Sequence, residues 1–236
     1  MRKFLPVLII AVLALVAVPA KANDTSTCGS TLSALLVTNY TCTIGPLTFS
    51  NFTFSSTASG TYTMVTAGSV AVISLTTPGN DGLEFNLLDT VNSITGGAGG
   101  IDVLLGFTVT DTTKSIDDLG LNITGSAVGT GFVQMSENYC TNGPVSACTQ
   151  GNTPLTVTDP PPVFTATTTF APTTSVSVEK DLTVDVGAAS GNADVSEFAQ
   201  TFSTIATPES ASLTLLGLGL LGLAGIKRSK LGQLSL

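Results

Sequence analysis

Apolar and polar residues alternate along most of the chain between residues 23 and 206, and this alternation restricts the fold more than any other feature. In the segment 101–109, large apolar residues occupy every second position, as in a strand with one buried face. The segment 176–186 repeats the pattern, with serine, threonine and acidic residues on its other face. Lys180 falls on the apolar side of this segment, so we expect an edge strand or a bend there.

Clusters of turn-forming residues separate other short segments of strand composition. Gly, Pro, Asn and Asp gather at 78–82, 96–100 and 142–144, and such clusters mark turns between strands. Between and around these turns, strands are expected at 47–54, 62–66, 70–76, 83–88, 119–124, 128–136, 163–170 and 193–202.

Helical composition is rare in this region, since only 31–37 and 112–119 look capable of forming a short helix. The stretch 152–175 is rich in threonine and contains three consecutive prolines, and we interpret it as a long crossover within one domain. Many short strands with few helices predict an all-β single domain, an antiparallel β-sandwich of the jelly-roll kind.

The charge of this region is strongly negative. Residues 23–206 contain only two basic residues, Lys114 and Lys180, against fifteen acidic ones, a net charge near −13. Such a surface repels phosphate backbones and anionic lipid, so nucleic-acid binding and docking on a lipid surface are disfavoured.

The cysteine pattern predicts two disulfides. Cys28, Cys42, Cys140 and Cys148 all lie between residues 23 and 206, and an even count favours pairing in an oxidising compartment. Three connectivities are possible, and we favour the local pairs Cys28–Cys42 and Cys140–Cys148. A zinc site is disfavoured because the chain has no histidine and no clustered cysteine ligands.

The first 22 residues have the organisation of a secretory signal peptide. Arg2 and Lys3 form a positive start, residues 4–18 are apolar, and Ala20-Lys21-Ala22 is a small-x-small cleavage site. We therefore expect export through the Sec machinery and removal of residues 1–22.

The chain ends in a second segment directed at the membrane. An uncharged Leu- and Gly-rich run, 211–226, is followed by Lys227, Arg228 and Lys230. As a helix the run reaches about 23 Å, somewhat short of a bilayer core of about 30 Å. The basic cluster would stay on the cytoplasmic side, which places the preceding residues outside the membrane.

Pro208-Glu209, the Leu/Gly-rich span and the terminal basic cluster resemble the PEP-CTERM sorting signal of bacterial exported proteins. The resemblance covers residues 207–230 and leaves 231–236 as a short tail; Ser210 stands where the family usually has a second proline. It implies that exosortase, a membrane transpeptidase-like enzyme, recognises the chain and cuts near Pro208 and Glu209. It further implies a cell-envelope location, with the C-terminal helix as the anchor before processing, and an association with exopolysaccharide.

A second resemblance concerns the region between the two terminal segments. Cys42-Thr-Ile-Gly45, the phenylalanine-rich segment 49–54, Gly82-Leu-Glu-Phe85 and Phe198-Ala-Gln-Thr-Phe202 are similar to a recurrent region of PEP-CTERM proteins without assigned function. The resemblance implies an all-β exported surface protein and brings no catalytic residues with it.

The residue types that the sequence lacks exclude several common kinds of catalytic site. The absence of histidine removes Ser-His-Asp and Cys-His arrangements and histidine-based metal hydrolases. A glycosidase needs two opposed carboxylates, and Glu84, Asp89, Asp102 and Glu137 are sufficient in number but not specific as a signal. No cofactor is implied, although Asp111, Asp117 and Asp118 flank a short loop that offers oxygen ligands to calcium.

These observations lead to one main functional hypothesis and one alternative. The main hypothesis is a non-enzymatic exported protein, sorted by exosortase to the cell surface or the extracellular matrix and associated with exopolysaccharide or biofilm. The alternative is a secreted carbohydrate-binding or carbohydrate-active β-sandwich with the same sorting signal. A concave face with clustered carboxylates and an exposed aromatic residue would favour the alternative, whereas flat, threonine-rich faces would favour the main hypothesis.

Overall fold

The computed structural model describes residues 28–205, except for 78, 88–93, 96–97, 114, 142, 149–154 and 188–190. The expected signal peptide and the expected sorting segment lie outside the described residues, together with Pro208, Glu209, Lys227, Arg228 and Lys230. In the part of the chain that is described, no helix is long and apolar enough to cross a membrane.

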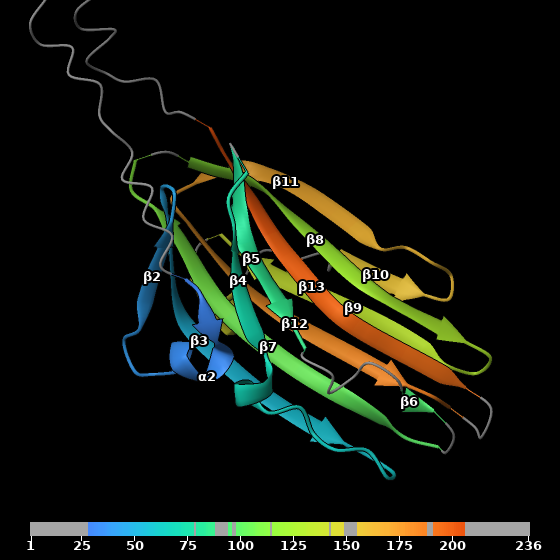
Figure 1. Ribbon diagram of the computed structural model, residues 1–236. Helices are drawn as coiled ribbons and strands as arrows, with labels where there is room; N and C mark the ends of the chain where they lie inside the picture. The colour runs from blue at the N-terminus through green and yellow to red at the C-terminus, as the bar shows by residue number, and fades with distance from the viewer. Residues whose placement is uncertain are drawn as a thin grey trace, which may run out of the picture.

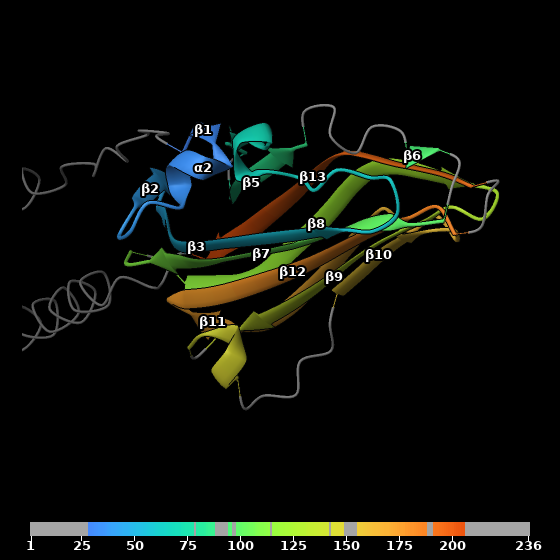
Figure 2. The same ribbon diagram turned by 90° about the horizontal axis from the view of Figure 1, so that it is seen from below.

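Strands of the described residues form two antiparallel sheets that stack face to face (Figures 1 and 2). The seven-stranded sheet has the order β1 (Ser30–Thr31), β4 (Ala71–Leu75), β5 (Asn80–Asn86), β13 (Asn192–Ile205), β8 (Ser115–Val128) and β11 (Thr165–Thr173), with β6 (Ile94–Thr95) also paired to β13. The six-stranded sheet has the order β10 (Leu155–Asp159), β9 (Phe132–Cys140), β12 (Ser175–Asp185), β7 (Gly100–Asp111), β3 (Leu47–Ala58) and β2 (Thr41–Ile44). The predicted all-β sandwich is therefore confirmed.

The inner faces of the two sheets share one hydrophobic core. Alternating residues of the strands point into it, as the sequence pattern requires. Aromatic rings bridge the sheets: the ring centroid of Phe107 on β7 lies 6.0 Å from that of Phe85 on β5 and 6.4 Å from that of Phe202 on β13. Phe85 also stacks on Phe198 at 5.0 Å. Such contacts favour close packing of the layers.

Different groups of residues close the two open sides of the sandwich. On one side, α2 (Leu32–Leu35) buries Leu32 and Leu35 between the edge strands of the two sheets, and the Cys28–Cys42 disulfide connects the residues before β1 to β2. On the other side, the ring of Tyr139 on β9 lies 5.5 Å from that of Phe170 on β11. The structure contains both predicted disulfides, Cys28–Cys42 and Cys140–Cys148.

The prediction of an edge position or a bend at Lys180 is wrong. β12 lies in the interior of its sheet, between β9 and β7. The lysine points into the core, where its ammonium contacts Glu137 and Gln200. A buried charge is tolerated only when polar groups surround it, and partners from distant parts of the sequence supply them here.

Two of the predicted local elements also differ. The predicted strand 62–66 is irregular and leads into η1 (Ala67–Ser69), because Thr66 and Ser69 bond one another: Ser69 Oγ donates to Thr66 O at 2.9 Å. The predicted helix 112–119 is instead a turn followed by the start of β8, where Ile116 and Leu119 enter the core. Pairing of β8 with β13 and β11 overrides the local helical preference. The helix expected in 31–37 is present as α2.

The stretch 152–175, expected as a long crossover, contains strands of both sheets. β10 belongs to the six-stranded sheet and β11 to the seven-stranded one. The three prolines 160–162 form the turn between them, closed by hydrogen bonds from Thr158 N to Val163 O at 2.9 Å and from Val163 N to Thr158 O at 2.7 Å. The stretch therefore crosses between sheets within a single core.

Candidate functional site

The outer face of the six-stranded sheet carries a regular array of polar side chains. Residues of β12 alternate between buried apolar positions and outward-facing serine, threonine and acidic residues. The register places Glu179 of β12 beside Gly106 of β7, and Gly106 beside Thr53 of β3. Because cross-strand neighbours lie about 5 Å apart, these side chains form one continuous surface.

This outer face is hollowed along the direction of its strands. A hollow of about 310 Å³ lies over Thr108 and Ser177, and a second of about 210 Å³ adjoins it over Leu104. Thr53, Gly106 and Glu179 line both of these hollows. A third hollow, of about 160 Å³, lies further along the same strands. We call this series the groove; residues on its strands are Asn51, Thr53, Ser55, Thr57, Asp102, Leu104, Gly106, Thr108, Ser177, Glu179, Thr183 and Asp185.

Gly106 makes the floor of the groove low at its centre. A Cβ atom at this position would lie 2.7 Å from Thr53 Oγ1 and 3.3 Å from Val178 O. A side chain here would fill the place where the two larger hollows meet. The glycine therefore makes room for the hydroxyl group of Thr53, which lies over β7 at the centre of the groove.

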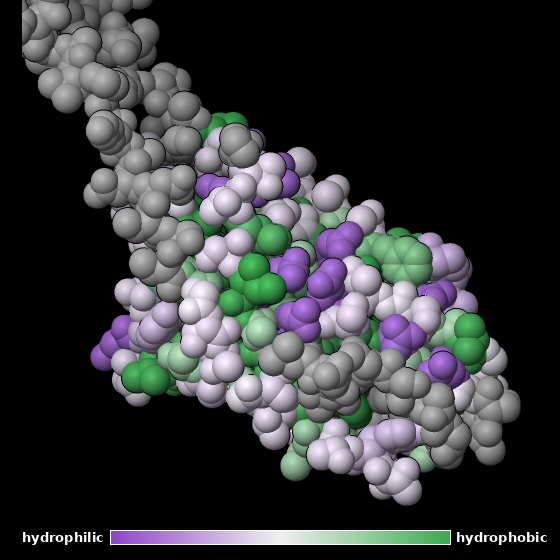
Figure 3. Space-filling view, viewed as in Figure 1, coloured by the Kyte–Doolittle hydropathy of each residue, from purple (hydrophilic) through white to green (hydrophobic). Residues whose placement is uncertain are grey.

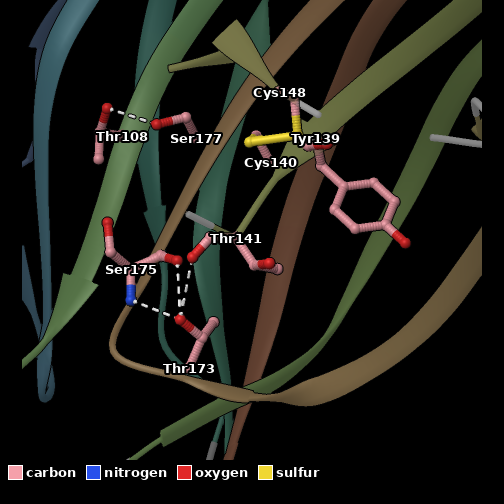
Figure 4. The surroundings of a disulfide bond; sticks show 8 residues. All are labelled: Thr108, Tyr139, Cys140, Thr141, Cys148, Thr173, Ser175 and Ser177. Atoms are coloured by element: carbon pink, nitrogen blue, oxygen red, sulfur yellow. Dashed lines mark hydrogen bonds between the residues drawn. A yellow bond between two sulfur atoms is a disulfide. The ribbon is translucent and has the colours of Figure 1, made fainter. Parts of the chain in front are cut away.

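A loop held by a disulfide forms one wall of the groove. Pro144, Val145 and Ser146, in and next to η2 (Val145–Ala147), line the larger hollow. Cys140 at the end of β9 is bonded to Cys148 just after η2. Figure 2 shows η2, in yellow, below the six-stranded sheet, and Figure 4 shows the disulfide close to Thr108 and Ser177. The disulfide thus holds the wall against the sheet.

Hydrogen bonds orient the hydroxyl groups beside this wall. Thr108 Oγ1 and Ser177 Oγ form a hydrogen bond of 3.1 Å in which either hydroxyl group can donate (Figure 4). Asn51 Nδ2 donates to Thr108 Oγ1 at 3.5 Å from a β-bulge of β3, where Asn51 has a φ of 55°. The bulge turns the amide towards the groove, as bulges often do at sites where a side chain is redirected.

Carboxylates gather at the other half of the same face. Burial raises the pKa of Asp181, and the neighbouring carboxylates of Asp102 and Glu179 raise it further. Asp102 is in turn the acceptor of a hydrogen bond, since Thr183 Oγ1 donates to Asp102 Oδ2 at 3.4 Å. This half of the face therefore presents acceptor groups and negative charge to a ligand.

The groove also contains an apolar contact and carries no exposed cation among its lining residues. Leu104 lies between the polar positions and is 40% exposed. Lys180 is the only basic residue that the structure describes, and it is buried. The groove thus offers hydroxyl, amide and carboxylate groups with a small apolar platform in a negative field.

The outer face of the seven-stranded sheet is polar as well, but it has a different organisation. Figure 3, which views the molecule as in Figure 1, shows hydrophilic residues over the middle of this face, where β5, β13 and β8 lie. Burial raises the pKa of Glu84 on β5, and the carboxylate of Glu197 on β13 adds to this effect. Outward threonines of β11 border the region.

Hydrogen bonds within the protein hold two of the three carboxylates proposed for calcium. Asp111 Oδ1 accepts from Thr113 N at 2.7 Å and from Thr113 Oγ1 at 3.0 Å, which is ordinary turn chemistry. Asp118 Oδ1 accepts from Ser203 N at 3.0 Å, while Asp117 lies at an irregularity of β8. Within the described residues, no three His, Cys, Asp or Glu side chains are grouped for a metal ion. Calcium binding by Asp111, Asp117 and Asp118 stays a prediction.

Of the four acidic residues considered for a glycosidase, the three that the structure describes do not come together. Asp102 lies in the groove, Glu84 on the opposite outer face and Glu137 in the core; Asp89 lies outside the described residues. The sequence interpretation also missed Gly106 and Glu179 as parts of one site. The alternation around Glu179 shows which way it points, but only the strand order brings it beside Gly106.

No protein-family model matches the sequence, and no curated protein matches it. Solved structures with some similarity include TmCBM61 in complex with β-1,4-galactotriose, 10% identical over 62% of this chain and 86% of that chain, with a TM-score of 0.24. The family 11 carbohydrate-binding module from Clostridium thermocellum, in complex with a β-1,3-1,4-mixed-linked tetrasaccharide, is 10% identical over 66% and 90%, with a TM-score of 0.24. The endoglucanase 3 of Trichoderma harzianum, from family GH12, is 12% identical over 64% and 98%, with a TM-score of 0.23. At scores this low, the similarity carries no information about what this chain binds.

Proposed function

We propose that this chain is an exported, non-enzymatic protein whose β-sandwich binds a neutral polysaccharide in the groove. The observation that carries the proposal is the combination of hydroxyl, amide and carboxylate side chains along one hollowed sheet face. From Gly100 to Thr108 a strand extends about 26 Å, so the groove has the length of an extended oligomer. Sugar hydroxyls both donate and accept hydrogen bonds, which matches this mixture of groups.

The charge of the groove supports a neutral ligand. Asp102, Glu179 and Asp185 line it, and Asp181 lies on the same face. A polymer of uronic acids would be repelled by this field, because like charges brought together without a counter-ion destabilise a complex. Neutral hydroxyl groups instead form charge-assisted hydrogen bonds with carboxylates.

The arrangement of the carboxylates supports binding without hydrolysis. A glycosidase places two separate carboxyl groups on opposite sides of the bond that breaks. Asp102 and Asp181 are instead neighbours on the same outer face of the sheet, so both lie on one side of a ligand.

Substitution of Glu179 tests the site against a matched position on the opposite face. With a soluble neutral β-glucan as probe, Glu179→Gln is expected to weaken binding about fivefold, the equivalent of about 1 kcal/mol for one hydrogen bond. Glu84→Gln removes a carboxylate from the outer face of the seven-stranded sheet and is expected to leave the dissociation constant unchanged. Calorimetric titration measures both.

A polyuronic acid of similar length is the control for charge, and we expect no binding of it by the unmodified protein. Equal weakening by Glu179→Gln and Glu84→Gln would show that the groove is not the site. Equal affinity for the neutral and the acidic polymer would overturn the neutral-ligand proposal.

The cellular location of the protein is a separate part of the proposal. The two disulfides indicate folding in an oxidising, extracellular environment, which supports export. The similarity of residues 207–230 to the PEP-CTERM signal supports sorting by exosortase to the cell envelope. A polysaccharide-binding domain delivered there would attach to the exopolysaccharide of the same surface.

A further inference from the structure

Three polar side chains meet in the middle of the hydrophobic core. Lys180 on β12 is 1% exposed, and Glu137 on β9 and Gln200 on β13 are both fully buried. The first two come from neighbouring strands of the six-stranded sheet, where they are directly opposite each other. Gln200 comes from the seven-stranded sheet, so this core triad bridges the two layers.

The lysine nitrogen is the common contact of the triad. Lys180 Nζ forms an ion pair with Glu137 Oε2 and donates a hydrogen bond to Gln200 Oε1. Gln200 Nε2 donates to Thr201 O at 3.5 Å, which orients the carboxamide. In the described part of the chain, neither oxygen of Glu137 has a donor besides the lysine.

The surroundings of the triad are apolar. The ring centroid of Phe107 lies 5.8 Å from Lys180 Nζ, and Leu105 is the neighbour of Lys180 on β7. Burial lowers the pKa of Lys180 well below its ordinary value, which favours the neutral, nucleophilic amine. A buried ion pair adds little stability, because desolvation offsets the attraction between the charges. Stability alone therefore does not account for the triad.

We propose that Lys180 and Gln200 form an intramolecular amide bond, with Glu137 carrying the protons. An amine, a carboxamide and a carboxyl group in contact are the reactants and the acid–base group that this exchange needs. The folded core holds them together permanently, so that the reaction has the advantage of a high effective concentration.

The reaction balances without any further reactant. Lys180 transfers one proton to Glu137, and the neutral Nζ attacks Cδ of Gln200 while Glu137 protonates Oε1. In the resulting tetrahedral intermediate, Glu137 takes a proton from Nζ and delivers it to Nε2. The bond from Cδ to Nε2 then breaks and ammonia leaves, while Oε1 returns its proton to Glu137, which ends as an uncharged carboxylic acid. The product is a neutral amide between Nζ and Cδ, which removes the charged pair from the core and links β12 covalently to β13.

Mass spectrometry of the purified full chain tests the bond directly. We expect the protein to be lighter than its processed sequence by the mass of one ammonia molecule. A digest should contain one branched peptide in which the Lys180 segment is joined to the Gln200 segment. Fragmentation of this peptide locates the linkage, independently of where the signal peptide and the tail are cut.

Variants separate the roles of the three residues. Glu137→Gln and Gln200→Leu are expected to keep the full mass, whereas Gln134→Leu, a change on the outer face of β9, is expected to lose ammonia like the parent. Circular dichroism and formation of both disulfides verify that each variant is folded. Because the parent protein alone decides whether the bond exists, a variant that fails to fold leaves the test intact.

Unmodified Lys180 and Gln200 in peptides from the folded parent protein would overturn the proposal. Loss of water in place of ammonia, with a peptide joining Lys180 to Glu137, would likewise show that Gln200 is not the group attacked. Loss of ammonia that persists in Gln200→Leu would assign the change to another residue and would also contradict the proposal.

Discussion

The carboxyl group of Asp181 lies on the outer face of β12, where burial and the nearby Asp102 and Glu179 raise its pKa. A raised pKa means that the folded state binds this proton more tightly than the unfolded state does. Asp181 therefore makes folding less favourable as the pH rises from the ordinary aspartate range, near pH 4, through the raised folded-state pKa. At pH values above the raised pKa, the destabilising contribution of Asp181 has reached its full size and no longer changes with pH.

Asp181→Asn should remove this loss. We expect the variant to be slightly more stable than the parent at pH 7, by less than about 1 kcal/mol because exposed carboxylates are screened. The difference should shrink as the pH is lowered towards 4. Thermal unfolding across this range measures it. Asp102→Asn removes the other member of the pair and should act in the same direction, and a variant less stable than the parent at pH 7 would contradict the explanation.

At the scale of elements, the two disulfides have the same chemistry and different consequences. Cys28–Cys42 lies at the edge where α2 closes the sandwich, away from the groove. Cys140–Cys148 holds η2, which forms a wall of the largest hollow. The sequence separations are 14 and 8 residues, so the chain-entropy model assigns them about 3 and about 2.5 kcal/mol.

Removing the two disulfides one at a time should therefore show which of them affects polysaccharide binding as well as stability. We expect Cys140→Ala with Cys148→Ala, and Cys28→Ala with Cys42→Ala, to lower the free energy of unfolding by about 2 to 3 kcal/mol each. Only the first pair of substitutions should also weaken polysaccharide binding, because only it releases the wall. Urea denaturation and titration of the two proteins measure these effects. Equal loss of affinity in both would point to a general effect of destabilisation.

At the scale of the whole molecule, the last two strands in sequence occupy central positions. β12 lies between β9 and β7, and β13 lies between β5 and β8. Most pairings in the molecule therefore join segments that are distant in sequence, a property of slowly folding β proteins. The core is complete only after the chain has reached Phe202, shortly before the segment that resembles a sorting signal.

Sorting should change the C-terminus of the mature protein. In cells with active exosortase we expect mass spectrometry to find a chain that ends near Pro208 and Glu209, without the apolar run 211–226. In cells lacking exosortase, and for Pro208→Ala with Glu209→Ala, the tail should remain and hold the protein in the membrane fraction. An identical C-terminus with and without exosortase would remove the support for this proposal.

The sequence by itself determined the fold class, the buried face of most strands and both disulfides. Alternation is a local property, and the direction of a side chain follows from its position along a strand. The two cysteines of each disulfide, Cys28–Cys42 and Cys140–Cys148, are close to each other in sequence, so their pairing could be predicted from the sequence. Two local elements were not predictable: a hydrogen bond between Ser69 and Thr66 ends the segment 62–66, and pairing with β13 and β11 makes a strand from Ser115 onward.

Only the tertiary structure decided the order of the strands, and with it both proposed sites. The sequence shows that Glu179 and Lys180 point in opposite directions, but not what each one meets. Antiparallel pairing with β7 places Glu179 over Gly106 in the groove, and stacking of the sheets brings Gln200 to Lys180 in the core. Both contacts join residues through pairing and packing between separate strands, which no periodicity within a single strand encodes.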